Sequence, residues 1–348
     1  MNTVLSKIKY ILKSVKVFIS SCFKVFKGVL IHETTGVNTD EAYQSMIGLY
    51  CLTNGYSNIF LSWLVKFYKP KYKFLNFKGV LGDLTPQQIN QVIQAIQKNG
   101  YYIFEELMPV EMCEKLISVA LTQECNLTGT TDVDIKVSKY NIDCPIATTY
   151  WLREEDLIAN PDIQSLMMDL SILAIAQAYL ETAPILDIVA MWWSTSVSKN
   201  ACTASAQLYH FDMDRIKWLK FFVYLTDVTT DTGPHCYIAG SHKPNNKPRE
   251  LLERGYARIS NEDIMKFYPQ SDFIEVTAPK GTIIAGDTSC FHKGKPLKTG
   301  QRLTLQLEFT NSLFGGSYLI SCLDKSRAQN LSKFAQIYRR IYSTFHFR

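Results

Sequence analysis

The chain has 348 residues, of which 47% are hydrophobic, 12% aromatic and only 20% charged, so it can bury a large core. This composition excludes a disordered chain, a collagen-like repeat and a disulfide-stapled miniprotein. The 37 lysines and arginines exceed the 32 acidic residues by a formal net charge of +5, which is too small and too dispersed to indicate nucleic-acid binding. We expect no nucleic-acid partner.

The nine cysteines are spread over the whole chain and form no CxxC pair. An odd number without paired spacing is typical of reduced thiols in a cytosolic protein, not of a zinc site or a disulfide framework. We therefore predict a cytoplasmic protein with buried, reduced cysteines. No stretch of 18 uncharged apolar residues occurs, so we expect no membrane span.

Residues 4–30 have the spacing of an amphipathic helix, with lysines on one face and apolar side chains on the other. The lysines are Lys9, Lys13, Lys16, Lys24 and Lys27, and the apolar residues are Leu5, Ile8, Leu12, Val15, Ile19, Cys22, Phe26 and Leu30. Two interpretations stay open. The helix packs on the core of the protein, or it makes a peripheral contact with an anionic membrane, which would place the protein at the inner face of that membrane.

The segment from Thr39 to Phe67 is apolar and is interrupted by Gly55, which predicts two short helices. A basic aromatic connector follows over Tyr68–Phe77, and it is the clearest boundary in the chain. We therefore expect residues 1–80 to form a helical N-terminal extension.

The next elements are marked at their ends. Thr85 is an N-cap followed by proline at the first helical position, and the apolar series after it stops at Gly100, so a helix is expected between them. A strand over Tyr101–Phe104, a helix over Pro109–Thr122 and a long buried helix over Pro161–Leu180 follow.

After Ala183 the pattern changes to short strand-type segments separated by Gly, Pro, Asn and Asp. The expected strands are Ile188–Ser194, Ser205–Phe211, Trp218–Leu225, His235–Ala239, Phe273–Thr277, Gly281–Ala285 and Arg302–Phe309. Short strands without intervening helices favour an antiparallel jelly roll with the earlier helices packed on one sheet, an α+β fold. The long charged connection Pro244–Ser271 is a natural lid over its mouth.

Metal-ligand chemistry is indicated by His210-Phe211-Asp212, because strand alternation puts His210 and Asp212 on the same face. His292 follows a later strand and a turn, and Arg302 opens the next strand. Two histidines and one carboxylate can hold octahedral Fe(II) and leave three positions open, two for an α-keto acid and one for O2. A planar guanidinium suits the far carboxylate of such a cosubstrate.

These residues occur in an order that resembles the phytanoyl-CoA dioxygenase family of Fe(II)/2-oxoglutarate oxygenases over about residues 84–312. The ordered set consists of His210-Phe211-Asp212, Gly233-Pro234, Gly240-Ser241-His242, His292 and Arg302. The resemblance implies a double-stranded β-helix of the cupin type and a dioxygenase in which His210, Asp212 and His292 bind catalytic iron. It also implies that Arg302 holds the distal carboxylate of 2-oxoglutarate.

The reaction implied by the family is hydroxylation of an unactivated C–H bond in a small-molecule or lipid-like substrate, with release of succinate and CO2. An intact Asp212 favours hydroxylation, because halogenating relatives lack this carboxylate. Two alternatives stay open: a jelly-roll binding protein without turnover, and an iron enzyme that runs desaturation, ring closure or epimerisation.

Strand parity adds candidates for the cosubstrate pocket. Thr304 shares the Arg302 face, and Lys220, Phe222 and Tyr224 share one face of the neighbouring strand. The family often has a serine two positions after the distal histidine, and this chain has Gly294 there, which puts a hydrogen bond from that position in doubt. His235 belongs to no recognisable ligand pattern.

Five basic residues in and beside the lid have two interpretations: they bind the phosphates of an acyl-CoA, or they form plain solvated surface. They are Lys243, Lys247, Arg249, Arg254 and Arg258. Asp214 and Arg215 have two interpretations, a surface ion pair or a contact with the substrate, and the ion pair is favoured. Residues 313–348 are expected to form a C-terminal tail with an amphipathic helix over Lys325–His346. The oligomeric state stays open.

Overall fold

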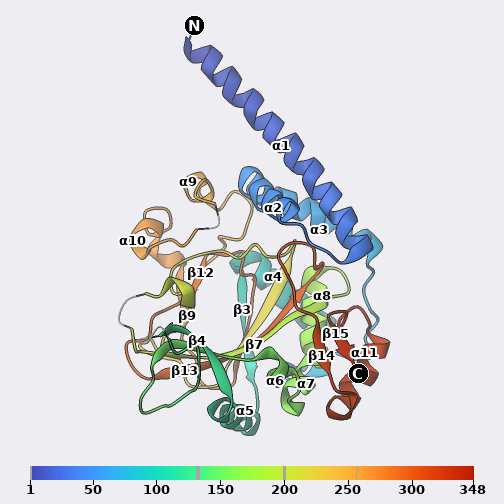
Figure 1. The fold of residues 1–348 in the computed structure, drawn as a ribbon, viewed down its shortest axis with the longest axis vertical. Coiled ribbons are helices and arrows are strands. Elements are labelled where there is room, and N and C mark those ends of the chain that lie inside the picture. The colour runs from blue at the N-terminus through green and yellow to red at the C-terminus, as the bar shows by residue number, and fades with distance from the viewer. Residues whose placement is uncertain (1, 131–133, 199–200, 256) are drawn as a thin grey trace.

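The computed structural model describes residues 2–130, 134–198, 201–255 and 257–348, with side chains described from residue 15 onward. A large antiparallel sheet faces a small one, helices cover the outer side of the large sheet, and the first helix projects away from this body (Figure 1). The expected α+β jelly roll is confirmed.

The large sheet has eight strands and the small sheet three. In spatial order the large sheet consists of β3 (Tyr101–Leu107), β11 (Thr282–Gly286), β8 (Trp218–Tyr224), β13 (Gln301–Thr310), β7 (Ile185–Thr195), β6 (Ala147–Leu152), β4 (Glu124–Thr130) and β5 (Val137–Lys139). The small sheet consists of β10 (Phe273–Val276), β9 (His235–Ile238) and β12 (His292–Gly294). Two further pairs are β1 (Lys78–Gly79) with β2 (Gly82–Asp83) and β14 (Ser321–Leu323) with β15 (Phe345–Phe347).

The helices fall into four groups along the chain. The N-terminal helices are α1 (Asn2–Thr35), α2 (Asp40–Thr53) and α3 (Tyr56–Tyr68), and the body carries α4 (Pro86–Asn99), α5 (Val110–Thr122), α6 (Glu154–Ile158), α7 (Pro161–Met167) and α8 (Leu170–Leu180). The lid segment holds α9 (Arg249–Leu252) and α10 (Asn261–Ile264), and the tail holds α11 (Gln329–Ile337).

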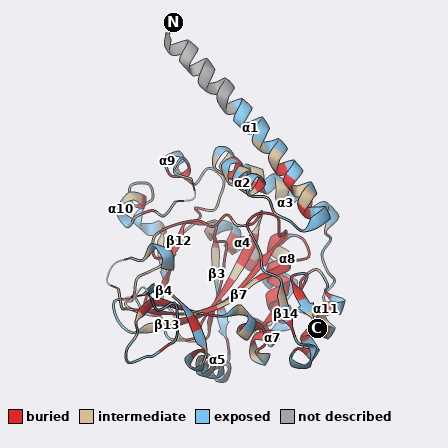
Figure 2. Cartoon of the chain, viewed as in Figure 1, coloured by how far each residue is buried: buried red, intermediate tan, exposed pale blue. Residues whose placement is uncertain are grey.

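Alternation along β8 separates the two faces of the large sheet. Leu219, Phe221 and Val223 belong to the main core under the helices, whereas Phe222 and Tyr224 belong to a second cluster between the two sheets. The expected parity is confirmed. Buried residues concentrate in the sheet and in α8, as Figure 2 shows. The aromatic side chains on the second face of β8 therefore lie in the space between the two sheets.

Helix α4 forms as its ends predict. The Thr85 side chain accepts a hydrogen bond from the Gln88 amide, the Gln88 side chain accepts one from the Thr85 amide, and Gly100 ends the helix with φ +90°. Gly100, which ends the helix, lies directly against the Cys290 side chain, so the segment after the helix is packed against Cys290.

The expected long helix over Pro161–Leu180 is wrong, because the chain breaks at Met168 and Asp169. The Asp169 carboxylate accepts hydrogen bonds from the amides of Ser171 and Ile172 and begins α8 as a new helix. By length and composition alone this stretch qualifies as a membrane span, but 72% of its apolar 18-residue window is buried inside the fold, as core helices of soluble folds commonly are.

Three smaller expectations are corrected. Ser205–Phe211 is not a strand, since only isolated bridges form at Tyr209 and His210. In the tail, α11 occupies only nine residues, and turns and a strand follow it. All nine cysteines are free, but Cys22, Cys144 and Cys322 are exposed rather than buried.

Helix α1 docks through a narrow face. Val25, Gly28 and His32 are buried, and Val25 packs in one cluster with Met46 of α2 and Phe314 of the tail. The apolar face named in the sequence stays exposed from Val15 onward. The expected side chains at positions 5, 8, 9, 12 and 13 lie outside the described residues.

Candidate metal centre

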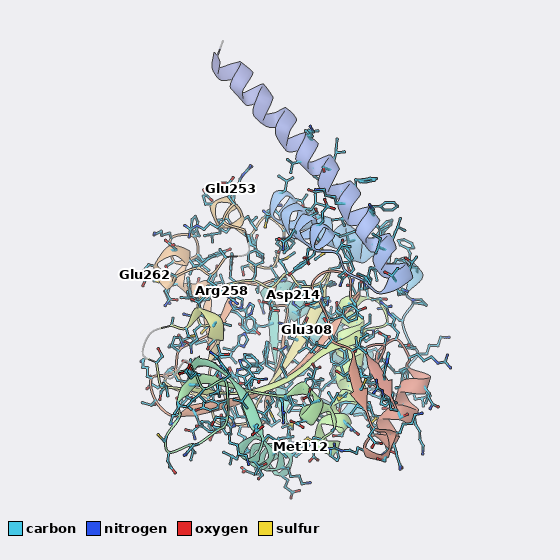
Figure 3. All side chains as sticks on the ribbon, in the orientation of Figure 1. Met112, Asp214, Glu253, Arg258, Glu262 and Glu308 are labelled. Carbon is cyan, nitrogen blue, oxygen red and sulfur yellow. The ribbon has the colours of Figure 1, made fainter. Side chains whose placement is uncertain are left out.

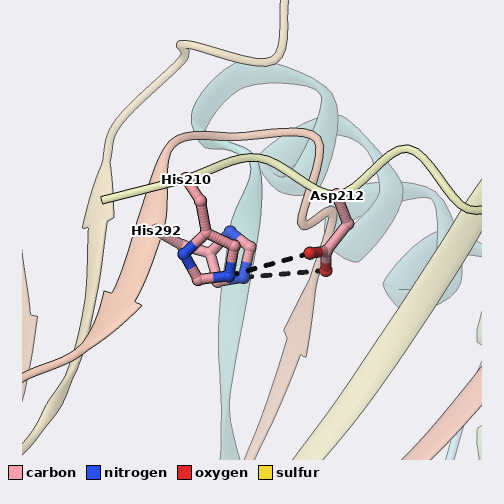
Figure 4. Close-up of side chains that lie close together, drawn as sticks. All are labelled: His210, Asp212 and His292. Atoms are coloured by element: carbon pink, nitrogen blue, oxygen red, sulfur yellow. Dashed lines mark ion pairs between the residues drawn. The ribbon is translucent and has the colours of Figure 1, made fainter. Parts of the chain in front are cut away.

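Three side chains from two distant segments converge between the sheets (Figure 4). His210 Nε2 lies 3.7 Å from Asp212 Oδ1, and His292 Nε2 lies 3.7 Å from Asp212 Oδ2. The three ligand atoms all lie within 4.8 Å of one another, and all three residues are buried. Phe211 points the other way and packs on Tyr50 and Phe291, so the alternation expected for this triplet holds although the segment is not a regular strand.

The backbone brings the histidines together. His210 and His292 exchange backbone hydrogen bonds of 3.0 and 2.8 Å as an antiparallel bridge. Residues opposite each other in such a pair project their side chains from the same face. The ring centroids of the two histidines are 4.2 Å apart.

Each imidazole is oriented by a carbonyl. His210 Nδ1 lies 2.9 Å from the Leu208 oxygen, and His292 Nδ1 lies 3.0 Å from the Cys290 oxygen. Carbonyl oxygens only accept hydrogen bonds, so both Nδ1 atoms carry the proton and both Nε2 atoms present a lone pair. Burial, together with His292, lowers the pKa of His210 to about 3, and burial also lowers the pKa of His292. Both rings are neutral, as metal ligands must be.

Asp212 is held in its ionised form by a buried lysine. Lys220 Nζ lies 2.8 Å from Asp212 Oδ2 and 3.2 Å from Glu308 Oε2. Burial alone would raise the pKa of Asp212, but the Lys220 ammonium beside it lowers this pKa well below its usual range. The structure thus places Lys220 at the carboxylate of the triad and gives it no contact with Arg302 among the described residues.

Arg302 is buried on β13 with most of its hydrogen-bonding capacity unused. Its Nη2 donates to Ser194 Oγ at 3.2 Å, while Nε and Nη1 have no partner among the described residues. Gly294 makes no side-chain hydrogen bond and leaves room instead, since a Cβ there would come within 3.3 Å of Nη2. Thr304, on the same strand face, has a buried hydroxyl that also lacks a partner.

The remaining predicted pocket residues line the same space. Phe222 stacks on His235 at a centroid distance of 4.4 Å. The Tyr224 hydroxyl is already engaged, because it donates to the Val276 oxygen and accepts from the His235 amide. Phe222 has no polar group and can only form an apolar wall of the pocket. The Tyr224 hydroxyl connects the large sheet to the small sheet through its bonds to Val276 and His235.

Sequence analysis missed His235 and Tyr237. Both side chains lie on the face of β9 that meets His292, and the His235 ring stacks 5.6 Å from the His292 ring. His235 Nε2 and the Tyr237 hydroxyl are buried without a partner among the described residues. Alternation along the predicted strand could have placed them together, but no ligand pattern pointed to them.

These donors test whether the expected groups fit. Two imidazole lone pairs and one ionised carboxylate form a donor set for a divalent first-row metal. The unpartnered N–H groups of Arg302 and the Thr304 hydroxyl match the acceptors of a carboxylate, and a buried guanidinium without a counter-charge is costly. The residues present fit both iron and 2-oxoglutarate.

Comparison with known proteins identifies the family of the chain. The family model for phytanoyl-CoA dioxygenase matches residues 96–303. No curated protein matches the chain. Among solved structures, the non-haem α-ketoglutarate-dependent epimerase SnoN from nogalamycin biosynthesis is 14% identical, with a TM-score of 0.50 over 65% of this chain and 84% of that chain. HygX from Streptomyces hygroscopicus, solved with nickel and 2-oxoglutarate, is 18% identical, with a TM-score of 0.46 over 69% and 91%. The structural likeness to SnoN shows a shared fold.

Proposed function

We propose that this chain, which belongs to the phytanoyl-CoA dioxygenase family of 2-oxoglutarate-dependent non-haem iron oxygenases, holds Fe(II) through His210, Asp212 and His292. Arg302 and Thr304 hold 2-oxoglutarate, and the reaction is hydroxylation of an unactivated C–H bond in a small-molecule or lipid-like substrate, with release of succinate and CO2. The observation that carries the proposal is the convergence of two Nε2 lone pairs and one carboxylate within 4.8 Å.

The protein side chains have distinct tasks in this proposal. Iron supplies the activation of O2 when it is bound. The carbonyls behind His210 and His292 fix the ring orientation, and Lys220 keeps Asp212 ionised. Arg302 binds the far carboxylate of the cosubstrate through its free N–H groups, and the Phe222 ring keeps water from that side.

Other outcomes at the same site remain alternatives to hydroxylation. SnoN is an epimerase, and desaturation or ring closure would use the same ligands. A binding protein without turnover is the other alternative. Product analysis separates the first group from hydroxylation, and metal binding with cosubstrate turnover separates both from a binding protein.

The experiment is an anaerobic titration of metal-free protein with Fe(II) and 2-oxoglutarate, following the visible charge-transfer band of the chelate. We expect a band in the native protein, no iron binding in Asp212→Ala, and a band that needs much more 2-oxoglutarate in Arg302→Ala. Asp231→Ala removes a half-exposed carboxylate that pairs with Lys298, and this variant should behave as the native protein. Iron binding that survives Asp212→Ala would contradict the proposed ligand set.

The proposed organisation has three parts: the helical extension at residues 1–80, the dioxygenase domain at 84–312 and the tail at 313–348. All side chains assigned to iron and cosubstrate come from the middle part. The tail packs against the dioxygenase domain, since Leu331, Ile341 and Tyr342 are buried in the main core. We further propose a cytoplasmic location, which the free thiols favour.

We also propose that α1 makes a peripheral contact with an anionic membrane. Ile19, Phe23 and Phe26 are 62%, 67% and 64% exposed, although they lie on a helix docked by its other side. Lys16 and Lys27 are exposed beside this apolar stripe. An exposed apolar face flanked by lysines is typical of helices that lie in the headgroup region.

Sedimentation with lipid vesicles tests this contact. We expect the full chain to bind vesicles that contain phosphatidylglycerol more strongly than vesicles of phosphatidylcholine alone. Phe23→Ser/Phe26→Ser should abolish binding, because both side chains are exposed and their loss leaves the docked face of α1 intact. Met265→Ser removes an exposed apolar residue of the lid and serves as the matched control. Equal binding by the double variant would contradict the contact.

A further inference from the structure

An arginine of the lid lies beside the metal centre by backbone register. Ile259 and Tyr209 exchange backbone hydrogen bonds of 2.8 and 3.0 Å as an antiparallel bridge. The neighbouring residues Arg258 and His210 are therefore opposite each other, and their side chains project from the same face. Since His210 is also opposite His292 on its other side, three neighbouring segments carry Arg258, His210 and His292 on one face.

The position of Arg258 agrees with its electrostatic effect. Figure 3 shows Arg258 below the lid helices. Its positive charge contributes to the lowered pKa of both His210 and His292, behind the larger effect of burial.

Within the residues that the structure describes, Arg258 has no acidic partner, in contrast to the other lid arginines. Arg249 pairs with Glu253 at 2.9 Å, and Arg254 pairs with Asp263 at 2.9 Å. Arg258 makes no ion pair or side-chain hydrogen bond within the described part of the chain, and it is exposed. A charged fork with five N–H donors is thus available to a ligand.

The other basic residues of the lid do not join it. Lys247 is only 2% exposed, donates to the Ser241 oxygen at 2.6 Å and lies over three aromatic rings. Lys243 lines a separate cavity between α3 and the body, together with Trp63 and Lys217. The five residues expected to bind several phosphates of an acyl-CoA therefore do not form one cluster.

We propose that Arg258 is a substrate-binding residue that holds a single anionic group, a carboxylate or a phosphate, at the open side of the metal centre. The proposal rests on the proposed function and adds the substrate class: a small molecule with one anionic group within reach of the oxidised carbon. Because Arg249 and Arg254 are each paired with an acidic residue, Arg258 is the lid arginine that binds the anionic group of the substrate. A bidentate contact from the guanidinium would also fix the orientation of the substrate over the metal.

The test uses the full chain loaded with Mn(II) and 2-oxoglutarate, with inorganic phosphate as the probe. Bound Mn(II) speeds the 31P relaxation of a phosphate that lies near it, and acetate methyl protons provide a parallel carboxylate probe. The electron paramagnetic resonance signal of free Mn(II) reports metal uptake separately. Calorimetry with phosphate in the absence of metal measures the anion site independently of the metal site.

We expect saturable relaxation enhancement in the native chain and about tenfold or more weaker binding in Arg258→Gln, the loss typical of a charge-assisted hydrogen bond. Arg258→Lys should retain part of the affinity, and Lys243→Gln should match the native chain. The stronger of the two probes identifies the anionic group. Arg258 is exposed, so these variants should fold normally, as circular dichroism will verify.

Two results would overturn the proposal. Equal enhancement in Arg258→Gln would show that phosphate binds the metal directly or another site, and absent enhancement with Mn(II) bound would show that no anion site exists there. Failure of Mn(II) to bind would instead contradict the proposed function. In that case the metal-free calorimetry of the native chain against Arg258→Gln still decides the anion site.

Discussion

Glu308 is a buried carboxyl group near the triad whose pKa is raised by its surroundings. Glu308, which Figure 3 labels, is buried on β13. Its carboxylate lies beside Lys220, which also pairs with Asp212. Burial raises the pKa of Glu308 to about 7, with smaller contributions from the neighbouring Asp187 and Asp212 charges and an opposing one from Lys220. One ammonium therefore serves two carboxylates, and only Asp212 is ionised at every ordinary pH.

The raised pKa predicts a pH-dependent stability. Since the folded state binds the Glu308 proton more tightly than the unfolded state, this contribution is complete below about pH 4.5 and is lost as the pH rises through 7. Glu308→Gln removes it. Relative to the variant, the native protein should lose on the order of 2 kcal/mol of unfolding free energy between pH 5 and 8. Denaturant unfolding at several pH values measures the difference.

Glu124→Gln, at an exposed carboxylate, provides the control and should give the same difference from the native protein at every pH. A Glu308→Gln difference that stays constant from pH 5 to 8 would mean that Glu308 does not titrate in this range.

Asp169 shows how one side chain divides an apparently continuous element. The apolar pattern of Pro161–Leu180 contains no proline or glycine after its first residue, so periodicity alone predicts one helix. In the fold, the Asp169 carboxylate also accepts from the Val80 amide at 2.7 Å. That contact, 89 residues away in sequence, favours a cap over helix continuation.

Asp169→Ala should therefore cost more than the loss of an ordinary cap. We expect a loss of about 3 kcal/mol, because a cap is removed and the Val80 amide loses its partner. Thr85→Ala, which removes the exposed cap of α4, should cost about 1 kcal/mol. Urea unfolding of both variants gives the comparison, and equal losses would show that the contact with Val80 contributes nothing.

Arg215 joins parts of the molecule that are far apart in sequence. It is buried and pairs with Asp187 of β7 through bonds of 2.6 and 3.0 Å, and it also donates to the Gly316 oxygen of the tail. The expected surface pair with Asp214 is wrong, since the Asp214 carboxylate instead accepts from Tyr43 of α2. Helices, sheet and tail thus meet at one buried charge next to the metal-binding segment.

Arg215→Met should destabilise the protein by about 3–5 kcal/mol, because Asp187 is left buried and unpaired. Arg215→Met/Asp187→Leu should recover much of this loss, since no uncompensated charge remains. Thermal unfolding and urea titration of the single and the double variant measure the two differences in unfolding free energy. A double variant less stable than the single one would mean that packing of the arginine, and not its charge, holds these parts together.

The sequence determined the features that depend on local spacing. Capping residues defined α4, strand alternation put His210 with Asp212 and Phe222 with Tyr224, and the order of motifs identified the family. These follow from the backbone periods of helix and strand, which any segment carries within itself. The same periods predicted the face of the helix or strand on which a side chain lies, but not the residues that this face contacts.

Only the tertiary structure decided which distant groups meet. It placed Lys220 on Asp212 and divided Pro161–Leu180 at Asp169. It also paired Arg254 with Asp263 and left Arg258, opposite His210, without a partner among the described residues. Each outcome depends on the register between segments far apart in the chain, and pairing such segments is selected by the burial and charge balance of the whole fold. No local pattern contains that information.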